Sequence, residues 1–407
     1  MTNSNQSAEQ AKSKHLKTIQ LSKDSCHSPF PYISGQKKLE HSQSFNYSFN
    51  NSSSTTSRSP YNNPLKGNIE NFIGYTQVPL GLAGPLLIDG DEAQGEFHIP
   101  LATTEGALVA SYSRGMKVSR LSGGIKTTCI QDRMERAPYF QFEDARKARE
   151  FEQWISQQAD ILSELVSTTS NYCQLKSLDN LQEGRGLILK LNYKTGDAAG
   201  QNMVTLTTNE ICQYIINKAP IKPTQWYIEA NHSGDKKAQS KSLAQTRGKK
   251  VIAEVTLKRA YVRSILKSTP EAMSRYFLNS TLATLQAGAI GNCGHVANAL
   301  TALFLACGQD VACVAESSPG LLRMEVTQGG DLYTALSLPS LVVGTVGGGT
   351  QLKTQAEALE MIDCLGAGKA KKFAELCCAT ALVGEISIAA AIAEKHFAKA
   401  HKILGRR

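Results

Sequence analysis

The alternation of apolar and polar positions separates a polar N-terminal stretch from a longer region with regular periodicity. Residues 1–68 are rich in Ser, Asn, Gln and Lys, and they offer too little apolar surface to offset the entropy lost on ordering. We expect this extension to be disordered or partly helical. From residue 69 onward, glycines and prolines separate short apolar runs, which is typical of strands and turns.

The middle of the chain alternates between helical and strand patterns. Apolar spacing predicts helices over residues 144–166 and 209–220, and strands over residues 184–197 and 224–232. We therefore expect a small βα-type module, inserted within a larger domain. The expected boundaries are 129–227 for the small module, and 69–128 together with 228–390 for the large domain.

Two long segments of the larger domain are almost free of charge. Residues 268–308 predict a helix that is apolar on all sides and therefore buried. Residues 371–404 predict another helix, whose basic final turns should emerge at the surface within a C-terminal segment of residues 391–407. Together, the patterns indicate an α+β fold.

Composition narrows the class of protein. A chain of 407 residues suits two or three packed modules, and 41% hydrophobic with 19% charged residues is typical of a globular protein. The ten cysteines are scattered and form no CxxC pair, so we expect neither a disulfide framework nor a metal site. No uninterrupted apolar run approaches the ~20 residues of a membrane span. We expect a cytoplasmic protein that has no membrane partner.

The net charge of +9 is concentrated between Asp235 and Lys267, where ten Lys or Arg residues face two acids. Such a surface attracts anions. Aromatic residues are sparse in this segment and no nucleic-acid-binding module is recognisable, so the phosphates of a small cofactor are favoured over nucleic acid. A solvated charged face is the alternative explanation.

Four ionisable residues suggest chemistry when they are taken together: Glu105 in "ATTEG", Lys236 in "GDKKA", Asp310 in "ACGQD" and His401 in "KAHK". Each alone could be a cap, a turn residue or a solvated side chain. Together they supply the acids, cation and imidazole needed to reduce a carbonyl and protonate a leaving group. No GxGxxG motif follows a predicted strand, so a nicotinamide cofactor would require a non-Rossmann scaffold.

From residue 69 to its C-terminus the chain resembles hydroxymethylglutaryl-CoA reductases. The motifs that carry the resemblance are "ENFIGYTQVPLGLAGPL" (70–86), "ATTEG" (102–106), "TGDAAGQNM" (195–203), "GDKK" (234–237), "GQD" (308–310) and "GTVGGGT" (344–350). The resemblance implies a large domain around a long buried central helix, with an inserted ferredoxin-like cofactor domain. It also implies a homo-oligomer whose active sites lie at the subunit interface.

That family reduces a CoA thioester to an alcohol and free CoA with two hydrides from a nicotinamide cofactor. The resemblance implies that Lys236 stabilises the developing oxyanion and that Glu105, kept protonated in a confined site, donates a proton. Asp310 would adjust the proton affinities of both residues. His401 would protonate the departing CoA thiolate.

Ligand contacts are also implied where the motifs match. Residues expected to contact the acyl-CoA substrate are Ser111, Arg114, Lys237, Lys267, His295 and Asn298. Residues expected to bind the cofactor are Asp197, Ala198, Gly200, Asn202 and Arg406. Because Arg406 would meet a 2′-phosphate, NADPH is favoured over NADH.

The sequence departs from the family at three positions that anchor the far carboxylate of hydroxymethylglutaryl-CoA. Thr128, Glu229 and Asn279 stand where an arginine, a serine and a lysine are expected, and Lys126 is a possible substitute. The segment after Asp310 lacks the usual Gln-Asn pair, and "TGDAAGQN" lacks the usual methionines. Three functions follow: formation of mevalonate from hydroxymethylglutaryl-CoA, reduction of another acyl-CoA, or CoA binding without turnover.

Overall fold

The computed structural model describes residues 65 and 67–395, which divide into two units, one ending at residue 76 and the other beginning at residue 77. Within the first unit, Asn68 donates its backbone N–H to the Leu65 carbonyl oxygen over 2.8 Å. The expectations for the polar extension, for the emerging C-terminal turns, and for His401 and Arg406 fall outside the described residues.

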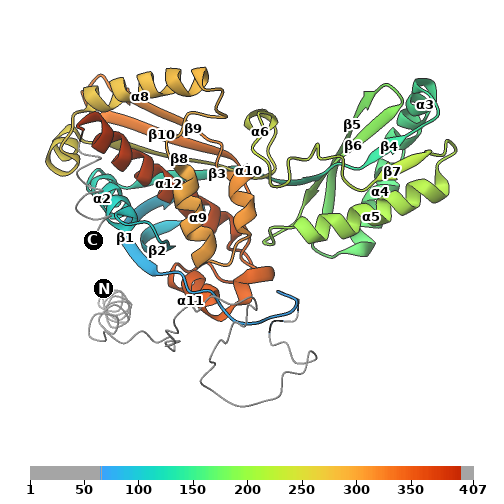
Figure 1. The fold of residues 1–407 in the computed structure, drawn as a ribbon, viewed down its shortest axis with the longest axis horizontal. Helices are drawn as coiled ribbons and strands as arrows, with labels where there is room; N and C mark the ends of the chain where they lie inside the picture. Colours follow the sequence, from blue (N-terminus) through green and yellow to red (C-terminus); the bar gives the residue numbers. More distant parts are fainter. Residues whose placement is uncertain (1–64, 66, 396–407) are drawn as a thin grey trace, which may run out of the picture. The chain divides into compact units, whose positions relative to one another are not determined.

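The second unit is built on an extended sheet (Figure 1). Strand β1 (Leu80–Gly90) pairs antiparallel with β2 (Gln94–Ala102) and parallel with the start of β3 (Ile125–Arg136). Beyond β3 the antiparallel order is β8 (Gly248–Leu257), β10 (Leu332–Leu341) and β9 (Leu321–Val326). Buried and less buried positions alternate along β8 and the first part of β10, so one face of the sheet carries core side chains.

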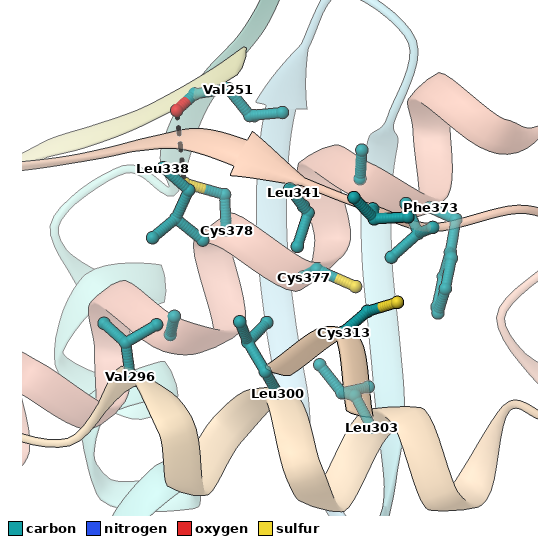
Figure 2. Packing of buried hydrophobic residues seen from close by; sticks show 14 of the residues in the cluster. Val251, Val296, Leu300, Leu303, Cys313, Leu338, Leu341, Phe373, Cys377 and Cys378 are labelled. Carbon is teal, nitrogen blue, oxygen red and sulfur yellow. Dashed lines mark hydrogen bonds between the residues drawn. The ribbon is translucent and has the colours of Figure 1, made fainter. Parts of the chain in front are cut away.

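The core of this unit is formed around helix α12 (Ala370–Ala393), which contacts β3, β8 and β10. It also contacts helices α2 (Leu108–Leu121), α8 (Pro270–Gln286) and α9 (Val296–Ala306). Small residues allow the close approach of α2. A Cβ on Gly115 would lie 2.1 Å from the carbonyl oxygen of Val383, a contact that no side chain tolerates. Figure 2 shows Cys377 and Cys378 of α12 among apolar residues of α9, β8 and β10.

By length and composition alone, α12 is the one described helix that could cross a membrane, yet 83% of its most apolar 18-residue window is buried inside the fold. The core helix of a globular domain has the same composition.

Residues 139–227 form a second antiparallel sheet with three helices. Strand β6 (Gly186–Lys194) pairs along one edge with β5 (Gln174–Glu183), and along the other with β4 (Tyr139–Gln141) and the end of β3. Strand β7 (Gln225–Tyr227) pairs with β4. The helices are α3 (Ala145–Ser156), α4 (Ala159–Thr169) and α5 (Gln201–Lys218).

The elements expected in this region are confirmed in part. The predicted strand 184–197 corresponds to β6, whereas the predicted strand 224–232 is confirmed only over the three residues of β7. The second predicted helix, 209–220, corresponds to the second half of α5, which ends at Lys218. The predicted helix over residues 144–166 is instead two helices, interrupted at residues 157–158. Asp144 caps the first of them by accepting the N–H groups of Arg146 and Lys147.

The prediction of one buried helix over residues 268–308 is wrong. Helix α8 (Pro270–Gln286) and helix α9 (Val296–Ala306) are separated by a segment in which Gly288 and Gly291 adopt positive φ. Helix α9 is largely buried, whereas α8 exposes an apolar stripe: Leu278, Leu282 and Leu285 are 59%, 58% and 68% exposed. Helix α8 has few charged residues, but its apolar face is not buried within this chain.

Short helices complete the described part of the chain. They are α6 (Lys241–Ala244), α7 (Arg259–Tyr261), a π-helical turn (Val262–Leu266), a 3₁₀ turn (Val311–Cys313), α10 (Val314–Ser317), a second 3₁₀ turn (Gly348–Gln351) and α11 (Lys353–Met361).

Candidate active site

The structure brings two of the predicted catalytic residues together. The Nζ atom of Lys236 lies 2.9 Å from Oδ2 of Asp310, and both side chains are partly exposed. This hydrogen bond raises the pKa of the Lys236 ammonium, which therefore stays protonated near neutral pH. The backbone of Lys236 is left-handed, with a φ of 59°, and its N–H donates to Oε1 of Glu316 over 3.0 Å. An unusual backbone conformation is thus held by a buried acid.

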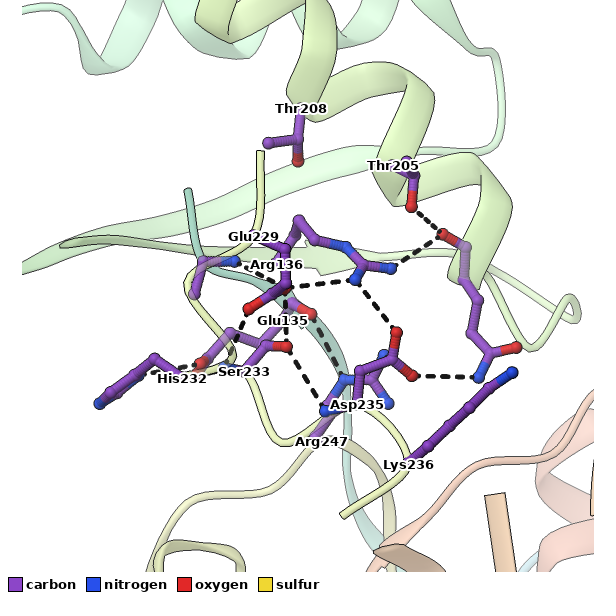
Figure 3. Close-up of polar contacts among 12 residues, drawn as sticks. Glu135, Arg136, Thr205, Thr208, Glu229, His232, Ser233, Asp235, Lys236 and Arg247 are labelled. Atoms are coloured by element: carbon purple, nitrogen blue, oxygen red, sulfur yellow. Dashed lines mark hydrogen bonds and ion pairs between the residues drawn. The ribbon is translucent and has the colours of Figure 1, made fainter. Parts of the chain in front are cut away.

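Behind Lys236 lies a cluster of buried and partly buried charges that we call the junction network: Arg136, Glu229, Asp235, Arg247 and Glu316. Figure 3 shows the Arg136 guanidinium between the carboxylates of Glu229 and Asp235, at distances of 3.2 and 3.0 Å. Arg247 pairs with Asp235 and with Glu316. Three carboxylates and two guanidiniums leave a net charge of −1 beside Lys236.

The junction network also changes proton affinities. Burial raises the pKa of the Glu316 carboxyl, despite the attraction of Arg247. Burial acts in the same direction on Asp235, but Arg247 and Arg136 together outweigh it and lower the pKa of that carboxyl. Removing Arg247 would leave Glu316 without a cation, and removing Arg136 would do the same to Glu229, which is the costly way to break a buried ion pair.

The network explains part of the basic excess between Asp235 and Lys267. Three of the ten cations there are neutralised inside the fold: Arg247 as described, Lys241 by Glu135 and Lys249 by Asp132. The expectation that this segment as a whole presents an anion-binding surface is therefore wrong for these three. Lys237 and Lys267 are exposed, and Lys237 donates its Nζ to the Asp235 carbonyl oxygen.

A second group of predicted residues gathers at the start of α9. Asn298 donates its side-chain amide to Oε2 of Glu105 over 3.0 Å. His295 directly precedes the helix, and its ring stacks on Tyr112 of α2 with ring centroids 5.9 Å apart. Nearby on α2, Ser111 and Arg114 both bind Ser387 of α12, and burial lowers the pKa of the Arg114 guanidinium.

The two groups lie at opposite ends of α9. Asn298, which holds Glu105, is in the first turn, and Asp310 follows the last turn. The helix has 11 residues, and at about 1.5 Å per residue its ends are about 16 Å apart. Glu105 is exposed in the single chain, so the confined site expected for it is not formed there. The two groups of candidate residues, which we call half-sites, therefore do not meet within one chain.

The segment "TGDAAG" leads into α5 and packs tightly on the glycine run at 344–350. A Cβ on Gly344 would lie 2.4 Å from the Ala199 nitrogen, and Gly200 has a φ of 85° at the start of α5. The carboxylate of Asp197 accepts the N–H groups of Gly368 and Ala370, so it anchors this loop to the start of α12. Ala198 is half-buried beside this anchor and Asn202 is exposed on the first turn of α5.

The departures from the family pattern have internal partners. Thr128 donates its hydroxyl to Asp91, and Glu229 belongs to the junction network, where it also accepts the Ser233 hydroxyl. Asn279 is exposed on α8. Lys126 is exposed and lines a surface cavity of about 330 Å³ together with Lys258, Glu254 and Tyr333.

The two other segments that differ from the family pattern contact each other through Gln201 and Cys313. The side-chain amide of Gln201, in the loop that lacks methionines, donates to the sulfur of Cys313, in the segment that follows Asp310. The same amide lies 3.4 Å from Asp235. Burial raises the pKa of the Cys313 thiol, so it acts here as a neutral acceptor.

Sequence reasoning missed the residues that hold these groups in place, namely Arg136, Arg247, Glu316 and Glu385. Glu385 carried a readable signal because it is an isolated acid in the apolar run "TALVGEISIAAA", the same signal that drew attention to Glu105. Three of the ion pairs in the junction network join residues that are 69 to 99 positions apart in the sequence, and no local pattern indicates such pairing.

In this α+β fold an ammonium paired with a carboxylate can stabilise negative charge on a carbonyl oxygen, and a second carboxylate held by Asn298 can exchange protons, which is chemistry that suits an oxidoreductase. Comparisons with known proteins agree with this class. Residues 36–406 match the family model described as hydroxymethylglutaryl-coenzyme A reductase. The chain therefore belongs to the hydroxymethylglutaryl-coenzyme A reductase family.

Relatives with that name are found in archaea. The 3-hydroxy-3-methylglutaryl-coenzyme A reductase of Pyrococcus horikoshii is 45% identical over 347 residues, covering 83% of this chain and 84% of the relative. The one from Methanocaldococcus jannaschii is 42% identical over 347 residues, covering 84% and 85%. Among solved structures, the class II reductase of Streptococcus pneumoniae bound to NADPH has a similar fold, with a TM-score of 0.63 and 17% identity over 80% of this chain and 88% of that chain.

The junction network predicts a distinctive response to pH. Arg247→Gln should lower the free energy of unfolding by about 3 to 5 kcal/mol at neutral pH, because Asp235 and Glu316 lose their shared buried cation. Asp235 keeps its pairing with Arg136, but the buried Glu316 carboxyl loses its cation and would bind protons still more tightly in the folded than in the unfolded state. The variant's stability should therefore rise relative to the wild type as pH falls from 8 toward 5.

Urea unfolding at several pH values measures this effect. Arg149→Gln, which removes an arginine paired with Glu152 at the surface, is the matched control and should cost less than about 1 kcal/mol. A deficit in Arg247→Gln that is independent of pH would contradict the assigned pairing.

Proposed function

We propose that this protein reduces hydroxymethylglutaryl-CoA to mevalonate and free CoA, with NADPH as the reductant. The single observation that carries the proposal is the Lys236–Asp310 pair, held on a left-handed backbone by Glu316. Such preorganised cations stabilise developing oxyanions most effectively, because they need no reorganisation during the reaction. Family membership supports the same reaction.

We assign a role in the reaction to each of the four candidate catalytic residues. Lys236 contacts the thioester oxygen and later the aldehyde oxygen, Asp310 holds the ammonium in place, and Glu105 supplies a proton to the forming alcohol. His401 protonates the CoA thiolate. The substrate contacts are assigned to Ser111, Arg114, Lys237, Lys267, His295 and Asn298.

The described residues around α5 suit a dinucleotide phosphate. The start of a helix presents free backbone N–H groups, and Gly200 supplies the left-handed residue from which the helix begins. We assign cofactor contacts to Ala198, Gly200 and Asn202, with Asp197 holding the loop, and to Arg406. NADPH, when bound, supplies the two hydrides. We further assign residues 129–227 to an inserted ferredoxin-like cofactor domain and 69–128 with 228–390 to the large domain.

We also propose a cytoplasmic homo-oligomer whose subunits complete each other's sites. The split of the half-sites across α9 supports this arrangement, because one copy's Glu105 can meet a second copy's Lys236. The exposed stripe of Leu278, Leu282 and Leu285 on α8 supports it as well, since an apolar helix face of this kind marks an interaction surface.

An alternative to hydroxymethylglutaryl-CoA as the substrate is favoured by two contacts within the chain: Thr128 bonds to Asp91, and Glu229 pairs with Arg136. Both positions, which the family resemblance assigns to the far carboxylate, carry no free cation here. A neutral acyl chain is therefore the alternative substrate class.

Lys236→Met should lower kcat by about 10²- to 10³-fold, because it removes the oxyanion partner. NADPH consumption measures the rate, with Lys147→Met as the control that removes an exposed ammonium paired with Glu150. Each enzyme is assayed with hydroxymethylglutaryl-CoA and with 3-hydroxy-3-methylbutyryl-CoA, which lacks the far carboxylate. A higher kcat/KM for the second substrate would establish the neutral-chain alternative, and unchanged turnover in Lys236→Met would refute the proposed mechanism.

Leu282→Glu should convert the oligomer to monomers and abolish turnover, because a charge on the α8 stripe would have to be desolvated in the interface. Sedimentation velocity and NADPH consumption measure the two effects. Ile161→Glu, on the exposed face of α4, is the matched control. An active Leu282→Glu monomer would contradict both the interface and the shared site.

A further inference from the structure

Two carboxylates lie inside the apolar helix α12, and one of them faces an imidazole. Glu375 and Glu385 are 0% and 2% exposed. Glu375 accepts the two backbone N–H groups of residues 92–93, and Glu385 accepts those of residues 294–295 over 2.7 and 2.6 Å. Each carboxylate therefore ties a distant turn to the core helix.

The two carboxylates differ in their other contacts. Oε1 of Glu385 lies 3.3 Å from Nδ1 of His295. That Nδ1 is buried and accepts or donates no hydrogen bond among the described residues. A bare nitrogen lone pair facing a carboxylate oxygen would be repelled, so the proton of a neutral His295 is favoured on Nδ1. The His295 side chain is 14% exposed, and because Nδ1 is buried this exposure belongs to the rest of the ring.

One face of the His295 imidazole is also covered by an aromatic ring. The Tyr112 ring stacks on His295 at an interplanar angle of 16°. Gly384, the neighbour of Glu385 on α12, makes this possible, because a Cβ there would lie 2.7 Å from the Tyr112 ring. Burial, reinforced by the charges of Glu385 and Glu105, holds the pKa of Tyr112 well above its usual range, so the phenol stays neutral.

We propose that Glu385 is a positioning residue that keeps the proton of His295 on Nδ1 and thereby leaves Nε2 as the atom available to the acyl-CoA half-site. Asn298, one helical turn away, holds Glu105 in the same half-site. The catalytic consequence rests on the proposed function, whereas the proton position does not.

The kinetic test compares the two buried acids of α12, because Glu385→Gln and Glu375→Gln each replace a buried carboxylate with an amide that has one oxygen. Glu375 accepts both N–H groups and the Thr127 hydroxyl on Oε2 alone, so a glutamine can keep these bonds, whereas Glu385 binds one N–H group with each oxygen and its glutamine must release one of them. Glu385→Gln should therefore lower the midpoint of urea unfolding more than Glu375→Gln. Only Glu385→Gln should lower kcat, by about 10- to 100-fold, as expected when the group that orients a functional histidine is lost. In a His295→Gln background the same change should alter kcat less than about twofold, since residues that act as a unit are non-additive.

The structural test needs no turnover. In protein labelled with ¹⁵N-histidine, the His295 signals are assigned by their absence from His295→Gln, and long-range ¹H–¹⁵N correlations report which ring nitrogen carries the proton. The wild type should show Nδ1–H, and Glu385→Gln should shift the signals toward Nε2–H. If Glu385→Gln does not fold, the wild-type signal decides.

Three results would overturn the proposal. They are an Nε2–H tautomer in the wild type, equal losses of kcat in Glu385→Gln and Glu375→Gln, or additive losses of kcat from Glu385→Gln and His295→Gln. A correct tautomer in a protein that consumes no NADPH with any acyl-CoA would leave the positioning of His295 intact and count against the proposed function alone.

Discussion

The burial of α12 is the constraint on which the rest of the structure depends. The helix is apolar on nearly all sides, so it must be covered by β3, β8 and β10 on one side and by α2, α8 and α9 on others. Covering it brings together segments that are far apart in the sequence. The two acids of the helix then act at defined points, because a buried carboxylate has to find N–H partners. Packing therefore determines where the polar groups of the candidate site are held.

The junction network holds Lys236 in an unfavourable backbone conformation, with its ammonium close to the carboxylate of Asp310. Its ions are buried and gain little net stability over apolar residues of the same shape. Their value lies in geometry. Glu316 binds the Lys236 N–H, Arg247 binds Glu316, and Arg136 reaches the Gln201 carbonyl at the start of α5. The loop that carries the ammonium is thus tied to the helix that we assign to the cofactor.

Much of the fold was predictable from local pattern, and the site from motifs. Strand β6 and helix α5 follow from periodicity, and the pairing of Lys236 with Asp310 follows from the residues that the motifs singled out. The interpretation of α8 failed because low charge alone does not show that a helix is buried within its own chain. Glu105 illustrates the same limit: a confined site was expected, and a single chain leaves the residue exposed. The junction network was not predictable, because its members are brought together only by tertiary packing.

The central claim is that each active site combines Glu105 of one copy with Lys236 of another. Mixing the inactive variants Glu105→Gln and Lys236→Met under conditions of subunit exchange tests it directly. In a symmetric dimer, half of the mixed dimers' sites are intact, so NADPH consumption should recover to about a quarter of the wild-type rate. If both residues served one site within a single chain, every site in the mixture would lack one of them, and no activity would return.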